Sequence, residues 1–149
     1  MTATTLCQRW LNQQSSWKNG RETVDVNRYF VAPVEEPHAK AFVEQHHYSK
    51  SFPAARLRYG LFDKQADGNL VGVAVLSVPV QEKVLSGPLP NLEPYVESLE
   101  LGRFVLLDDV PANGETWFLS RAFKLAHADG IKAVVSFSDP QPRHKTVKG

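Results

Sequence analysis

The run from His46 to Ser51 places two imidazoles, a phenol, two hydroxyls and an amine next to one another. Imidazole titrates near neutral pH, so His47 or Tyr48 could act as an acid or a base. The plain alternative is that a histidine at a helix C-terminus complements the helix dipole. Metal binding is not favoured, because adjacent histidines on a helix point about 100° apart and no HxxxH or HExxH spacing is present.

Two charged residues, Glu100 and Arg103, stand in a segment that is otherwise apolar. Removing a charge from water is costly, so buried charged residues normally form ion pairs or serve a site. A mutual salt bridge is one interpretation. Their odd spacing argues mildly against it, because it predicts that the two side chains lie on opposite faces of a strand.

Asp139 follows the apolar segment Ile131–Phe137 and precedes a proline. As a site residue, its carboxylate would face a crevice and accept a proton from an attacking amine. As a structural residue, the Asp-Pro pair would only begin a turn. We give these two interpretations equal weight.

A helix start at Asn113–Thr116 could bind an anion such as a pyrophosphate. Ligands of open α/β sheets bind beyond the carboxyl ends of strands, where helix N-termini present free amides. Asp108, Asp109 and Glu115 would repel such an anion, and the sequence has neither a GxGxxG motif nor a P-loop. Composition alone therefore gives only a weak phosphate signal.

Aromatic and basic residues raise the question of nucleic-acid binding. Aromatic side chains can stack on a nucleobase, although most belong to a core, and the candidates are Trp117, Tyr48, Phe52 and Tyr59. Candidate basic patches are Lys50, Arg56, Arg58 and Arg103, and the C-terminal run Arg143, His144, Lys145 and Lys148. Scattered, solvated charge explains any one of them equally well. A net charge of only +1 argues against a protein that coats nucleic acid.

Length and composition predict one globular domain spanning residues 1–149, with 42% hydrophobic and 22% charged residues. The single cysteine, Cys7, excludes an intrachain disulfide and a zinc site of paired cysteines. No apolar segment approaches the length of a membrane span and no signal peptide is present, so we expect a cytoplasmic protein with no membrane contact.

Apolar periodicity predicts the elements that position these residues. The first half contains a weak helix over Leu6–Trp17, a turn at Lys18–Gly20, a strand over Val24–Val34, a helix from Glu35 to about Tyr48, and a hairpin of Leu57–Phe62 with Leu70–Val78. A proline-rich connection over residues 86–94 follows. The second half contains a strand over Glu97–Leu107, a helix over Glu115–Asp129 capped by Asn113 and ended by Gly130, and a strand over Ile131–Phe137. A strand–helix–strand ending implies a parallel pair, and hence an α+β fold with a mixed central sheet flanked by helices.

Six segments in this order resemble the Mom family of phage DNA-modification proteins, over about two-thirds of the chain. They are His47–Ser51, Tyr59–Phe62, Leu70–Ala74, Glu100–Phe104, Glu115–Arg121 and Ser136–Pro140. Mom proteins resemble the GNAT acyltransferase fold. The resemblance implies a transferase that converts adenine in double-stranded DNA to an N6-carbamoylmethyl derivative, protecting phage DNA from restriction in the host cytoplasm. It also implies acetyl-CoA as cofactor and suggests an iron requirement.

The resemblance also assigns site residues by position. Phe104, Val105 and Leu106 would lie on the strand that lines the pantetheine arm, and Asn113, Gly114 and Thr116 at the helix start near the pyrophosphate. The reacting centre would be surrounded by His47, Tyr48, Ser49, Arg103, Ser138 and Asp139. Asp139 or Tyr48 would manage the proton, and Arg103 would position phosphate or substrate.

The GNAT arrangement continues with another helix and two strands, so the resemblance implies a fold that is incomplete at the C-terminus. Three alternatives follow: a truncated member, a homodimer that completes the sheet, or a non-catalytic remnant that binds a partner. An N-acetyltransferase acting on a small amine, a peptide or an RNA base is a further alternative.

Overall fold

The computed structural model describes the backbone of residues 6–11, 14–19, 23–47 and 51–137, and the side chains of residues 23–47 and 51–137. The main elements in chain order are β1 Leu6–Leu11, β2 Gln14–Asn19, β3 Tyr29–Pro33, α1 Glu36–His46, β4 Ala55–Asp63, β5 Asn69–Ser77, α2 Lys83–Ser86, β6 Ser98–Leu106, α3 Gly114–Ala128 and β7 Ala133–Val135. None of the described helices is long and apolar enough to cross a membrane.

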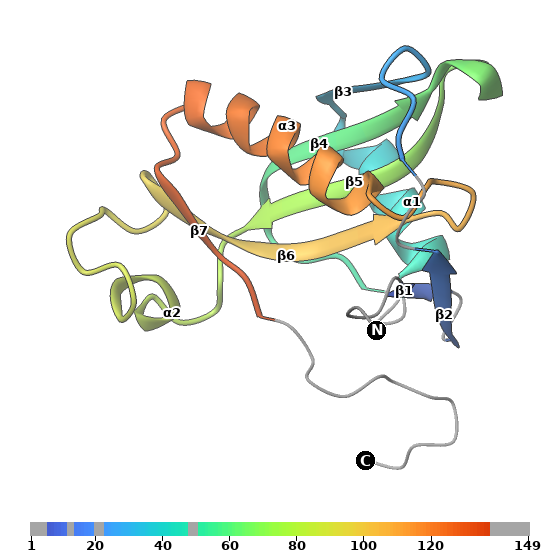
Figure 1. Ribbon diagram of the computed structural model, residues 1–149. Coiled ribbons are helices and arrows are strands. Elements are labelled where there is room, and N and C mark those ends of the chain that lie inside the picture. Colours follow the sequence, from blue (N-terminus) through green and yellow to red (C-terminus); the bar gives the residue numbers. More distant parts are fainter. Residues whose placement is uncertain (1–5, 12–13, 20–22, 48–50, 138–149) are drawn as a thin grey trace, which may run out of the picture.

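A five-stranded sheet in the order β3-β4-β5-β6-β7 organises the chain (Figure 1). Its neighbours pair antiparallel except β6 and β7, which are parallel. The predicted mixed α+β architecture is therefore confirmed, including the strand–helix–strand unit at the end. Helices α3 and α1 cover opposite faces of the sheet (Figure 1).

Each sheet face carries its own apolar cluster. On the face covered by α3, the larger cluster contains Tyr29, Tyr59, Leu61, Leu76, Leu99, Leu106, Phe118 and Ala122. On the face covered by α1, the smaller cluster contains Ala39, Phe42, Val43, Val73, Val75 and Val105. Burial of both faces explains why β5 is a nearly continuous apolar run in the sequence.

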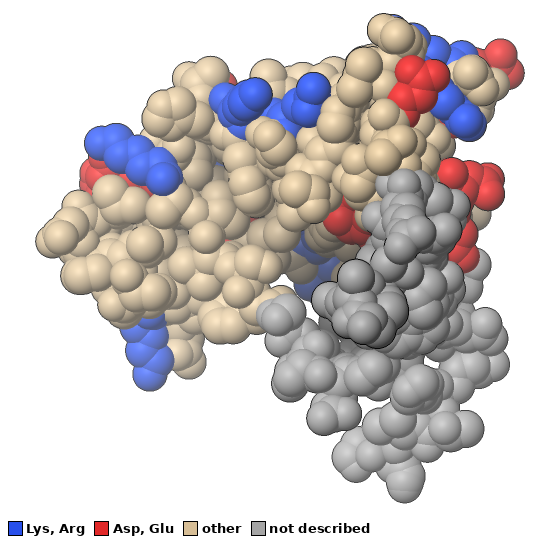
Figure 2. Space-filling model, in the orientation of Figure 1, with Lys and Arg blue, Asp and Glu red and all other residues tan. Residues whose placement is uncertain are grey.

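Charged side chains of both signs are interspersed on the surface that Figure 2 shows. Two of the basic candidates have structural partners. Arg58 donates to the Val34 carbonyl at 3.2 Å and pairs with Glu36 at 3.5 Å. Arg56 donates to the Tyr95 carbonyl at 2.6 Å. For these two arginines, the interpretation as scattered surface charge fits better than a nucleic-acid patch.

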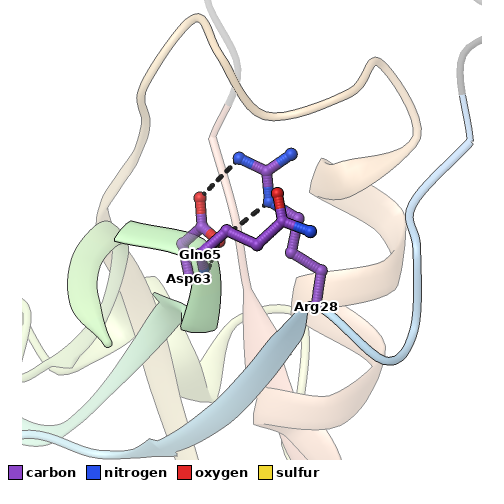
Figure 3. A network of polar contacts seen from close by, with 3 residues as sticks. All are labelled: Arg28, Asp63 and Gln65. Carbon is purple, nitrogen blue, oxygen red and sulfur yellow. Dashed lines mark hydrogen bonds and ion pairs between the residues drawn. The ribbon is translucent and has the colours of Figure 1, made fainter. Parts of the chain in front are cut away.

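A bidentate ion pair fixes the start of β3 to the end of β4 (Figure 3). Arg28 donates from Nε and Nη2 to the two oxygens of Asp63, each at 2.8 Å. The Gln65 amide also donates to Asp63 Oδ1 at 2.9 Å, which caps the turn after β4. Asp67 and Gly68, with φ of 59° and 71°, then close the predicted long-loop hairpin.

Three sequence predictions need correction. The weak helix over Leu6–Trp17, and the turn at Lys18–Gly20, are wrong: β1 and β2 form an antiparallel hairpin in which Lys18 and Asn19 belong to β2. There the backbone groups pair across two strands instead of along a helix. The strand predicted from Val24 begins only at Tyr29. Asp25 holds a turn before it, accepting the Asn27 amide on its side chain and the Arg28 amide on its carbonyl, both at 2.9 Å. A short helix that was not predicted, α2, lies between β5 and the proline-rich connection.

A β-bulge at Gly102 changes the expected geometry of β6. Across β5, Glu100 pairs with Ser77 and Arg103 pairs with Val75, so one extra residue lies between the two charges. Because Ser77 and Val75 are two residues apart, Glu100 and Arg103 lie on the same face of the sheet. The prediction of opposite faces is therefore wrong.

Candidate functional site

Arg103 projects on the sheet face covered by α1 and contacts the segment that follows this helix. Its Nε donates to the Ser51 carbonyl at 3.0 Å, and its Nη2 donates to the Ser51 hydroxyl at 2.7 Å. Its Nη1 donates to the Gly102 carbonyl at 2.6 Å. The guanidinium is thus oriented by Ser51, and no ion pair with Glu100 is among its described contacts.

Arg103 takes this position because β6 and β5 approach each other closely at the bulge. A Cβ on Gly102 would collide with Ser77 Oγ and would lie 3.0 Å from Ser77 Cβ and 3.2 Å from Pro53. A glycine is therefore required where β6 meets β5 and the chain that leads into β4. Bulges commonly redirect a side chain beside a functional site.

His47 lies next to Arg103 at the C-terminus of α1. It is 9% exposed, and its backbone amide donates to the Val43 carbonyl at 2.8 Å to close the helix. Burial, followed by the positive charge of Arg103, lowers the pKa of His47 to about 4. The lowered pKa favours a neutral imidazole at physiological pH over the interpretation that a charged His47 complements the helix dipole.

A neutral imidazole and a guanidinium together form a polar corner on this face. The imidazole can donate one hydrogen bond and accept another, while the guanidinium supplies a permanent positive charge. The structure thus brings together two of the predicted site residues, His47 and Arg103. Tyr48, Ser49, Lys50, Ser138 and Asp139 lie outside the described residues.

Strand β6 has one edge that is only partly paired. It joins β7 from Ser98 to Glu100, opposite Ala133–Val135, and Figure 1 shows the two strands diverging beyond that point. Over the rest of β6, no described strand pairs with this edge. The side chains of Val105 and Leu106 are buried, one in each cluster, so what this edge of β6 presents is its backbone groups.

The start of α3 also departs from its predicted form. Asn113 occupies the N-cap position but makes no side-chain capping bond, and its Oδ1 is buried without a hydrogen-bond partner among the described residues. The predicted capping role of its side chain is therefore wrong. Gly114 is buried where a Cβ would collide with Val110, which allows the helix to begin close to the loop after β6. Thr116 is exposed.

Of the aromatic candidates for base stacking, two are structural. Tyr59 is 1% exposed, and its hydroxyl donates to Asp129 Oδ2 at 3.1 Å. Phe52 packs against the smaller cluster. Trp117 instead lines a pocket between β3 and α3, with Tyr29 and Arg121 beside it. The sequence analysis missed Tyr29 and Arg121, although the four-residue spacing of Trp117 and Arg121 along one helix face could have indicated them.

Metal ligands are not gathered in the part of the chain that the structure describes. No three histidine, cysteine, aspartate or glutamate side chains there lie together as a metal site requires. Iron, which the family resemblance suggests, therefore has no ligand set among these residues.

Comparison with known proteins shows which family the chain belongs to. No curated protein matches its sequence. The family model of the Mom protein family matches residues 28–147, which include β3 to β7, α1 and α3. The match covers most of the chain, and the chain belongs to the Mom protein family.

Proposed function

We propose that this protein modifies the N6 amine of adenine in double-stranded DNA to the N6-carbamoylmethyl base, with an acyl-coenzyme-A-type molecule as cofactor. Acyl transfer from acetyl-CoA alone would give an N6-acetyl base, so a glycine-derived co-substrate supplies the methylene and the amide nitrogen of the product. Membership of the Mom family points to a phage DNA-modifying enzyme with DNA as its substrate. The observation that carries the finer proposal is the divergence of β6 from β7 beside Arg103.

The open edge of β6 suits the donor. Unpaired backbone N–H and C=O groups need hydrogen-bond partners, and the pantetheine arm of coenzyme A is an extended chain with two amides. Beyond Glu100 the edge offers backbone groups from Leu101 to Leu106. These residues would hold the arm as an added strand, and acetyl-CoA is the cofactor that we propose for this opening. Asn113, Gly114 and Thr116 at the start of α3 would lie near its pyrophosphate.

Arg103 and His47 would position the acceptor. The guanidinium can hold a DNA phosphate or the base by directed hydrogen bonds, and Ser51 fixes its orientation. The neutral imidazole of His47 can hydrogen-bond the base without adding positive charge to the site. The adenine amine is a poor nucleophile because its lone pair is delocalised, so the base must be held in place, flipped from the duplex.

The amine must also lose a proton when the new bond to N6 forms. Asp139 or Tyr48 is the proposed acceptor of this proton, with Ser138 beside them. His47 is a weak base for this role at neutral pH, because its pKa lies near 4. We therefore assign His47 to positioning.

Nucleoside mass spectrometry of plasmid DNA from cells that express the chain tests the proposal. We expect a heavier deoxyadenosine with the natural sequence and a large loss of it with Arg103→Ala and with Asp139→Asn. Arg56→Ala is the matched control, because Arg56 is an exposed arginine bonded only to a loop carbonyl in the structure described. Unmodified DNA with folded natural protein would overturn the proposal. Modification that survives Arg103→Ala in folded protein would overturn the role of Arg103.

A second candidate rests on the same divergence of β6 and β7, since any acyltransferase using coenzyme A could use that opening. It is an N-acetyltransferase that acts on a small amine, a peptide or an RNA base. Acetyl-CoA turnover with such an acceptor, together with unmodified plasmid DNA, would favour it. Turnover of either kind would exclude a non-catalytic remnant.

A further inference from the structure

A pocket lies on the other face of the sheet, between β3 and α3. It has a volume of about 400 Å³, within the usual range for small-ligand sites. The residues that line it are Val26, Tyr29, Phe30, Val31, Trp117, Arg121, Lys124 and Leu125. Because α3 and α1 cover opposite faces, this pocket is separate from the corner formed by His47 and Arg103.

One face of α3 supplies the positive charge. Trp117, Arg121 and Lys124 follow one another at spacings of four and three residues, so their side chains share one side of the helix. The Arg121 guanidinium lies 3.9 Å from the centroid of the Trp117 ring, and this cation–π contact holds it in place. Figure 2 shows basic side chains over α3. Neither cation forms an ion pair with a carboxylate of the described residues.

Two residues that line the pocket each carry a buried polar atom without a partner in the described part of the chain. Tyr29 is only 3% exposed, and neither its hydroxyl nor the Trp117 indole nitrogen has a hydrogen-bond partner among the described residues. A buried polar atom without a partner normally costs stability, so such atoms often mark a site that a ligand completes. Burial raises the pKa of Tyr29, which keeps the phenol protonated and able to donate.

The side chains that line the pocket determine which class of ligand it can bind. The indole N–H, the guanidinium and the ammonium can only donate hydrogen bonds, and the phenol is available to donate as well. The ligand must therefore carry negatively charged acceptor atoms. The remaining wall is apolar, at Val26, Val31 and Leu125, and it suits a flat body with little polarity at its faces.

We propose that this pocket binds a nucleoside phosphate, with the phosphate on Arg121 and Lys124 and the base against the apolar wall. The buried hydroxyl of Tyr29 and the indole N–H of Trp117 would then donate to ligand oxygens. The ligand is either a free nucleotide or one nucleotide of a DNA strand, which share this chemistry. The inference goes beyond the proposed function and does not depend on it.

Titration of the purified full chain, followed by NMR at the Trp117 indole N–H, tests the inference. The Trp117→Phe variant assigns that resonance. The probes are dAMP, deoxyadenosine, inorganic phosphate, a short single-stranded oligonucleotide and a duplex. We expect dAMP to shift the resonance and deoxyadenosine to bind at least about tenfold more weakly, because it lacks the charge. Tighter binding of either DNA probe than of dAMP would identify a DNA strand as the source, and binding of dAMP alone would identify a free nucleotide.

Variants locate the binding. Arg121→Gln should weaken dAMP binding by about tenfold or more, whereas the matched control Arg56→Gln should leave it unchanged. Arg121→Lys keeps the charge and should retain part of the affinity. That result would show that the weaker binding of Arg121→Gln does not come from misfolding. The inference is overturned if no phosphate-bearing probe shifts the Trp117 signal, if deoxyadenosine binds as tightly as dAMP, or if folded Arg121→Gln binds normally.

The two proposals fail in different assays. The titration needs no donor and no modification reaction, so it is independent of activity on DNA. Arg103→Ala should lose modification but still bind dAMP at the Trp117 signal. A chain that modifies no DNA can therefore still confirm the pocket, and a chain that modifies DNA can still lack it.

Discussion

The two faces of the sheet are formed by the same strands but carry different kinds of side chain. The face covered by α3 buries large aromatic side chains, including Tyr59 and Phe118, and contains the larger apolar cluster. The face covered by α1 has a cluster built mostly of valines, and Arg103 lies on the same face beyond it. On the α1 face, a polar side chain thus lies on an inner strand of the sheet. On the α3 face, the polar side chains lie at the edge of the sheet, beside β3.

This difference shows how a small domain can separate stability from function. Deep packing of aromatic side chains leaves no room for a polar site, so the α3 face fixes the fold and holds its pocket only at the margin. On the α1 face, a bulge and a helix end interrupt the regular structure, and these are the places where Arg103 and His47 lie. The following predictions test this division of roles.

Truncation of the central aromatic residue on each face should have unequal effects. Phe118 is fully buried, so Phe118→Ala should lower the free energy of unfolding by about 3–5 kcal/mol. Phe42 is 8% exposed and lies in the smaller cluster, so Phe42→Ala should cost less. Urea unfolding of both variants measures the difference. An equal or larger loss for Phe42→Ala would contradict the assignment of the main core to the α3 face.

Adding a side chain at Gly102, in the bulge, should destabilise the packing on the α1 face. In Gly102→Ala, the new methyl group would collide with Ser77 and Pro53 and cost about 1–3 kcal/mol of unfolding free energy. The double variant with Ser77→Gly removes the nearest atoms and should recover part of the loss in a double-mutant cycle. A Gly102→Ala variant as stable as the natural protein would show that the strands have room there, which would contradict the required close approach.

The Arg28–Asp63 pair should stabilise the edge strand beside the α3-face pocket. The hydrogen bonds from Arg28 hold the pKa of Asp63 below its ordinary value. The pair therefore contributes stability that is fully present above the unfolded pKa of the carboxyl and is lost as pH falls through the lower, folded value. Asp63→Asn should lower Tm by several degrees at pH 7 and by less near pH 3, with thermal unfolding at the two pH values as the measurement. A loss of Tm that is the same at both pH values would show that the charge pair is not its cause.

Sequence patterns predicted the elements whose signals are local. Gly130 after α3, with a φ of 97°, ends the helix as predicted, because the conformational preference of glycine depends on few neighbours. The hairpin of β4 and β5 follows in the same way from its turn residues. The first hairpin was missed because its weak apolar periodicity resembled a helix, while its pairing is a property of two segments together.

The site was predicted only in part for a related reason. A positive charge in an apolar run indicated Arg103 as a candidate, but its partner is Ser51, which lies 52 positions away in sequence. The bulge depends on Ser77 across the sheet and leaves no local pattern, so the two charges on β6 were assigned to the wrong faces. The pocket likewise requires β3 to meet α3, two elements far apart in the chain.

His47 offers the most specific test of the polar corner, with the smallest effect on the fold. Burial and the nearby charge of Arg103 depress its pKa to about 4, so the folded protein keeps the imidazole neutral while the unfolded chain takes up a proton near pH 6.5. Stability should therefore fall as pH drops from about 6.5 towards 4, and His47→Gln should remove that part of the slope. NMR titration of the imidazole measures the pKa directly. Because burial is the larger cause, Arg103→Met should raise the value only part of the way to normal. An ordinary pKa in the natural protein would mean that His47 is open to water, and the polar corner would then be an exposed surface.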